Sequence, residues 1–134
     1  MNLVAQMLWG QGKVVAIRRD FPSVTLPWLQ LGFVDPAEDG TVDTERIAAA
    51  VDAQTAVLTL GSVHYQSGFR HDLRELGAYC RAQGLLLVVD ATQQAGAVRV
   101  DLSGDEVDFL VCSAYKWLTA GYGIGFLYVN RRHL

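Results

Sequence analysis

The sequence predicts a three-layer α/β fold, in which a mostly parallel sheet of about six strands has helices on both faces. Its short apolar runs are continuous rather than alternating, which is typical of strands covered on both sides. Helical patterns lie between several of these runs, as they do in right-handed strand–helix–strand units. Hydrophobic residues make up 51% of the chain, which is enough for a core between the layers.

Six apolar segments are predicted as strands, because each is short and is bounded by glycine, proline or polar residues. They are residues 14–18, 28–34, 56–63, 85–89, 109–112 and 125–129. Two prolines occur in segment 20–27, and we therefore predict a loop there rather than a helix.

Helices are predicted where apolar residues recur with helical spacing between capping residues. They are residues 2–9, 45–51 and 73–83. Either Asp43 or Thr44 is the N-cap of the second helix. The third helix begins after Asp72 and ends at Gly84, which suits the left-handed conformation of a helix end.

Composition excludes several classes of protein. A net charge of −3 does not suit a nucleic-acid-binding surface. No apolar run approaches the roughly 18 residues of a membrane helix, and no signal-peptide pattern is visible. Cys80 and Cys112 are too few for a disulfide framework or metal cluster, and we interpret both as core residues of a cytoplasmic protein without a metal.

Polar residues gather after three of the predicted strands. His64 follows the third strand, Asp90 and Gln93 follow the fourth, and Ser113 and Lys116 follow the fifth. Ligands of open α/β sheets bind at such carboxyl ends of strands. A lysine amine can form an imine with an aldehyde cofactor, and a neighbouring carboxylate can keep the cofactor ring nitrogen protonated.

Each of these residues also has an ordinary structural interpretation. Asp90 could cap a helix, and Lys116 could lie on the surface. His64, Gln93 and Ser113 could be structural or solvated loop residues. The chain has only two lysines among eleven basic residues, which makes a lysine between apolar strands less ordinary.

Taken together, several stretches resemble the class V aminotransferase family. They are Asp-Ala-Thr-Gln-Gln-Ala-Gly at 90–96, Ser-Ala-Tyr-Lys-Trp at 113–117, the glycine-rich segment 121–129, Asp-Phe-Pro-Ser at 20–23 with Pro-Trp at 27–28, and segment 62–73. This family comprises fold-type I enzymes that use pyridoxal phosphate, including cysteine desulfurases, kynureninases and isopenicillin epimerase-like proteins. The resemblance covers nearly the whole chain.

The resemblance implies a role for each residue. Lys116 would form the imine with pyridoxal phosphate and move a proton at the substrate α-carbon. Asp90 would pair with the ring nitrogen, Gln93 would contact the ring 3′-oxygen, and Ser113 would contact the phosphate. His64 would lie near the same ring edge, although glutamine or asparagine is more usual at its position.

The resemblance also implies a partial domain. Residues 1–134 would form the core of the large domain, without the N-terminal phosphate-binding turn, the aromatic residue or histidine that stacks on the ring, or the C-terminal small domain. From this we expect little turnover by the chain alone. The resemblance further implies an amino-acid substrate and a homodimer or higher homo-oligomer.

Three functional hypotheses remain. The first is a pyridoxal-phosphate enzyme acting on amino acids, or a fragment of one. The second is an inactive α/β remnant that acts as a self-associating structural module. The third, a nucleotide-binding domain, is weak, because no Gly-x-Gly-x-x-Gly motif follows the first strand and the one glycine-rich segment precedes a strand.

Overall fold

A computed structural model describes residues 1–104 and 106–134 and confirms the predicted α/β fold. Six strands form one sheet in the order β2-β1-β3-β4-β5-β6. All neighbouring pairs are parallel except β5 and β6, which are antiparallel. The strands are β1 Lys13–Ile17, β2 Leu31–Val34, β3 Thr55–Gly61, β4 Leu86–Asp90, β5 Phe109–Ser113 and β6 Gly125–Val129.

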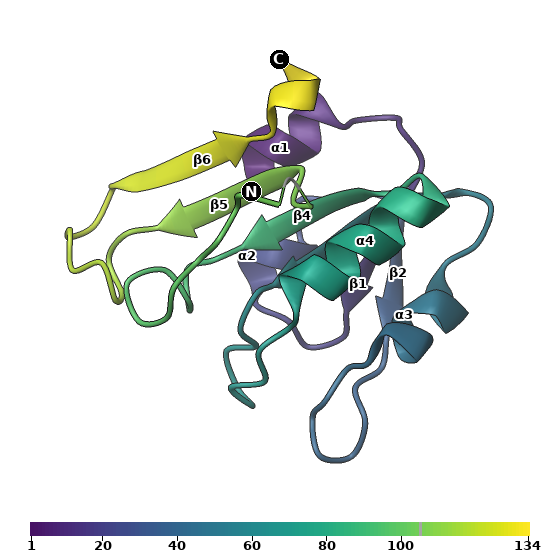
Figure 1. The fold of residues 1–134 in the computed structure, drawn as a ribbon, viewed down its shortest axis with the longest axis horizontal. Coiled ribbons are helices and arrows are strands. Elements are labelled where there is room, and N and C mark those ends of the chain that lie inside the picture. Colours follow the sequence, from purple (N-terminus) through teal and green to yellow (C-terminus); the bar gives the residue numbers. More distant parts are fainter. Residues whose placement is uncertain (105) are drawn as a thin grey trace.

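Helices cover both faces of the sheet (Figure 1). One face carries α3 (Thr44–Ala50) and α4 (Leu73–Gln83), and the other carries α1 (Asn2–Met7) and α2 (Pro22–Thr25). Each face therefore has its own hydrophobic core.

Strand β4 shows why the apolar runs are continuous. Its side chains alternate between the two faces, so Leu87 and Val89 pack in the core beneath α3 and α4. Val88, between them, packs in the core beneath α1. All three are fully buried, because neither face of the strand meets solvent.

The capping residues define the two longer helices as predicted. Asp72 accepts hydrogen bonds from the backbone N–H groups of Arg74 (2.9 Å) and Glu75 (3.1 Å) at the start of α4. Gly84 ends that helix in the left-handed conformation. The N-cap of α3 is Asp43, whose carboxylate accepts from the backbone N–H of Arg46 at 2.8 Å.

The prediction for segment 20–34 was wrong in two places. Residues 22–25 form α2 instead of a loop, because a proline at the first helical position removes only an N–H that has no partner within the helix. Residues 28–30 precede β2 instead of belonging to it. Trp28 is buried, and its indole N–H donates to the carbonyl of Val24 at 2.8 Å, which ties the segment to α2.

After β6 the chain forms a short 3₁₀ helix, η1 (Arg131–His133), at the end of the sheet where β6 finishes (Figure 1). Among the described residues, no helix has the length and apolar character needed to cross a membrane.

Candidate functional site

A pocket of about 180 Å³ lies at the carboxyl ends of β3, β4 and β5. Four of the predicted site residues line it, and they come from two neighbouring strand ends. Asp90 is the last residue of β4 and Gln93 follows it, while Ser113 is the last residue of β5 and Lys116 follows it. The sheet brings them together because β4 and β5 are parallel neighbours, with Asp90 paired to Val111.

The carboxylate of Asp90 accepts few hydrogen bonds from the described residues. Its Oδ1 accepts from the backbone N–H of Thr92 at 2.9 Å. Its Oδ2 accepts from the hydroxyl of Ser23 at 3.3 Å, which is a long contact. This second oxygen therefore has capacity for a charged donor placed in the pocket.

The amine of Lys116 faces aromatic rings. Its Nζ atom lies 5.4 Å from the ring centre of Phe21 and 5.7 Å from that of Tyr115. It forms no ion pair with any residue that the structure describes.

Phe21 is an aromatic wall of the pocket that sequence reasoning missed. Phe21 lines the pocket and packs edge-on against Tyr65, with ring centres 5.3 Å apart. The segment Asp-Phe-Pro-Ser contributed to the resemblance, but no local pattern indicated that its phenyl ring reaches the lysine.

A buried carboxylate positions this aromatic wall. Asp20 accepts from the backbone N–H of Phe21 at 2.6 Å and from that of Gly61, at the end of β3, at 2.7 Å. Burial raises the pKa of Asp20 above its usual value, and these two hydrogen bonds offset part of that effect. Asp20 thus connects Phe21, the N-cap of α2, to Gly61, which also lines the pocket.

His64 does not line this pocket. Its Nε2 donates to the carbonyl of Arg19 at 3.2 Å, and its Nδ1 accepts from the backbone N–H of Ser67 at 3.3 Å. The ring borders a separate cavity of about 540 Å³ beside β1 and β2. Both nitrogens are engaged by the surrounding loops, so the structure separates His64 from the other four predicted residues.

The turn after β4 packs closely against the loop that carries Lys116. Gly96 has a φ of +93°, and a Cβ atom at this position would lie 2.6 Å from the carbonyl carbon of Trp117. Only glycine combines this backbone conformation with so close an approach. Gly96 therefore helps to hold the Gln93 turn and the Lys116 loop against each other.

Comparison with known proteins identifies the family. The family model described as Aminotransferase class-V matches residues 1–134. A cysteine desulfurase IscS from Shewanella baltica is 34% identical over 103 residues, which is 77% of this chain and 25% of that protein. One from Colwellia psychrerythraea is 33% identical over the same shares. The chain thus spans a quarter of the length of these relatives.

Solved structures agree with the fold. The apo structure of a cysteine desulfurase from Thermococcus onnurineus NA1 superposes with a TM-score of 0.84 at 27% identity, covering 98% of this chain and 36% of that one. The cysteine desulfurase CsdA of Escherichia coli gives a TM-score of 0.85 at 21% identity, covering 96% and 35%. Since the family model matches every residue from first to last, the chain belongs to the class V aminotransferase family.

Proposed function

We propose that this chain is the cofactor-binding core of a pyridoxal-phosphate-dependent enzyme that transforms amino acids. Members of its family use this cofactor. The observation that carries the proposal is the placement of the Lys116 amine and the lightly occupied Asp90 carboxylate in one pocket with an aromatic wall. Desulfuration is the finer proposal for the reaction, because the relatives named above are cysteine desulfurases.

The donor set of the pocket fits the cofactor. A pyridine ring needs an apolar face, an anionic partner for its nitrogen and an amine for its aldehyde. Phe21, Asp90 and Lys116 would supply these three groups. Ser113 and Met1, which precedes α1, border an adjoining cavity of about 340 Å³, and the Ser113 hydroxyl would contact the phosphate.

Pyridoxal phosphate, when bound, supplies an electron sink for bond cleavage at the substrate α-carbon. The carboxylate of Asp90 would keep a proton on the ring nitrogen, and Gln93 would donate a hydrogen bond to the ring 3′-oxygen. Lys116 would hold the aldehyde carbon covalently and then carry a proton to or from the substrate α-carbon.

Reductive trapping tests the proposal, because the chain has only Lys13 and Lys116. Lys13 is paired with Asp52 at 2.7 Å at the opposite end of the sheet, so it serves as an internal control. We expect borohydride reduction in the presence of pyridoxal phosphate, followed by peptide mapping, to label Lys116 preferentially. Equal labelling of both lysines, or preferential labelling of Lys13, would refute the assignment.

Self-association is a second proposal, and it suits either an active enzyme or an inactive structural module. Large apolar side chains are exposed on the loop between β5 and β6 and on β6 itself: Trp117, Tyr122, Ile124 and Phe126. Such a patch on an edge strand favours association.

Light scattering tests this proposal. We expect it to give a dimer or larger species at micromolar concentrations, and we expect the double variant Ile124→Ser with Phe126→Ser to shift that species towards monomer. A wild-type monomer at all these concentrations would contradict the proposal.

A further inference from the structure

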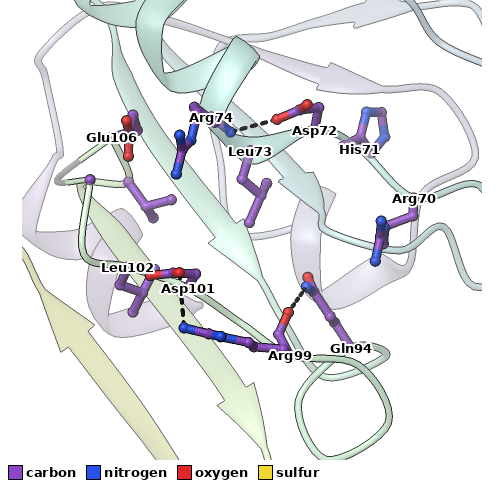
Figure 2. A pocket seen from close by; sticks show the side chains of 12 residues that line it. Arg70, His71, Asp72, Leu73, Arg74, Gln94, Arg99, Asp101, Leu102 and Glu106 are labelled. Carbon is purple, nitrogen blue, oxygen red and sulfur yellow. Dashed lines mark hydrogen bonds and ion pairs between the residues drawn. The ribbon is translucent and has the colours of Figure 1, made fainter.

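A second cavity, of about 280 Å³, lies beside the start of α4 (Figure 2). Its walls are the loop before this helix and the connection between β4 and β5. It shares no lining residue with the Lys116 pocket. The turn after β4 separates the two cavities, with Gln93 on the lysine side and Gln94 on this side.

Gln94 presents an unpaired acceptor to this cavity. The residue is 6% exposed, and its Nε2 donates to the carbonyl of Arg99 at 3.0 Å. That carbonyl can only accept, so the amide nitrogen must face it and the oxygen must face the other way. The oxygen, Oε1, is buried and has no hydrogen-bond partner among the described residues (Figure 2). Buried acceptors are normally paired, so this one calls for a donor from a ligand.

The charged side chains of the cavity include groups without a partner. Arg99 is paired with Asp101 at 3.2 Å. By contrast, Arg70 and Glu106 form no ion pair with any residue in the described ranges, and Arg74 interacts with the Asp101 carboxylate and helps to lower its pKa. An unpaired cation and an unpaired carboxylate in one cavity suit a ligand that carries both signs of charge.

The formal charges of the cavity cancel at neutral pH. Among the lining residues that the structure describes, three arginines are balanced by three carboxylates, Asp72, Asp101 and Glu106. His71 adds no charge, because burial lowers its pKa to about 4. A multiply charged anion such as phosphate is therefore less well matched than a ligand with no net charge.

We propose that this cavity binds a free zwitterionic α-amino acid. Its ammonium group donates to Gln94 Oε1, and its carboxylate accepts from the guanidinium of Arg70. Leu73, Leu102 and Val107 supply apolar wall for an aliphatic side chain. This site is distinct from the Lys116 pocket and does not depend on the function proposed for that pocket.

Nuclear magnetic resonance of the ¹⁵N-labelled chain tests the site, with L-valine as the probe. We expect titration to shift the Gln94 side-chain amide and the backbone amides near Arg70 and Arg99. Two analogues divide the recognition into its parts: N,N,N-trimethylvaline lacks N–H donors, and 3-methylbutanoate lacks the ammonium group. We expect each to bind at least tenfold more weakly than valine, because neither can donate to Gln94.

A variant tests the same contact from the protein side. Gln94→Leu removes the acceptor at nearly constant volume and should weaken valine binding at least tenfold. Gln83→Leu changes an exposed glutamine at the end of α4 and should leave binding unchanged. If Gln94→Leu fails to fold, the comparison of valine with trimethylvaline on the wild type still decides.

Three outcomes would overturn the proposal. The first is an absence of valine-dependent shifts around this cavity. The second is equal binding of valine and trimethylvaline. The third is binding of inorganic phosphate as tight as that of valine, which would indicate a general anion site.

Discussion

Two aspartates at opposite ends of neighbouring strands are used in different ways. Asp108, just before β5, is almost fully buried and is surrounded by donors. It accepts from the backbone N–H of Leu87 at 2.8 Å, from Arg132 Nη2 at 2.7 Å and from His133 Nε2. Asp90, at the end of β4, accepts one backbone N–H and one long contact from a hydroxyl.

The difference distinguishes a structural carboxylate from one that is ready for a ligand. A carboxylate has about four acceptor positions. Four described donors contact Asp108, three at Oδ1 and one at Oδ2, and they hold η1 against the start of β5, so a ligand at Oδ1 would displace part of the fold. Asp90 is partly exposed in a pocket and keeps unused capacity.

The largest expected effect on stability comes from replacing each of the two aspartates by asparagine. Asp108→Asn should lower the free energy of unfolding by about 3 kcal/mol, because it leaves Arg132 and His133 without their buried anion. Asp90→Asn should lower it by about 1 kcal/mol or less, since an amide oxygen still accepts from Thr92. Urea denaturation measures both. Equal losses would remove the distinction between the two residues.

The pH dependence of stability provides the next test, because His71 and Asp20 respond to acid in opposite directions. The pKa of His71, beside the pocket end of the sheet, is lowered to about 4 by burial, whereas in the unfolded chain it is about 6.5. Below pH 6.5 the unfolded state therefore binds the extra proton, and stability should fall by about 3 kcal/mol as the pH drops to about 4. The raised pKa of Asp20 acts in the opposite sense.

His71→Gln isolates the contribution of this histidine. It removes the titrating ring, so the decline in urea midpoint between pH 7 and pH 4.5 should become shallower than in the wild type. A variant with an unchanged slope would show that other groups control the acid response.

A smaller effect is expected from the contact between the two site loops. Gly96→Ala should cost about 2 kcal/mol, because it combines a positive φ with a backbone clash at Trp117. Gly68→Ala is the matched control, with a φ of +73° and no atom within 4 Å of the new Cβ, and should cost about 1 kcal/mol. Equal urea midpoints for the two variants would mean that the loops separate freely.

Most of the fold could be predicted because its signals are local. Helix α4 has an aspartate at its start and a glycine at its end, and β4 is a short apolar run that ends in a polar residue. Helix α2 was missed because prolines were interpreted as barring a helix, although Pro22 occupies the first helical position. The strand predicted at 28–34 was too long because Trp28 looks apolar in sequence but precedes β2, packing in the core beneath α1 and donating a hydrogen bond to α2.

The site was only partly predictable, for a different reason. Asp90, Gln93, Ser113 and Lys116 share a pocket because parallel strands place their carboxyl ends at one edge. The direction of a side chain within a loop depends on distant partners, however. Arg19 and Ser67 turn His64 away, and Asp20 brings Phe21 in, and neither arrangement is marked in the sequence near the affected residue.

The antiparallel direction of β6 has a practical consequence for handling the protein. Since β6 starts opposite Ser113 at the pocket rim and runs antiparallel to β5, its five residues carry the chain about 17 Å along the sheet away from that rim. Leu134, just after η1, is 92% exposed. A fluorophore, affinity tag or surface linker attached there would stand clear of Lys116, so immobilised protein should keep its pocket open to small molecules in the surrounding buffer.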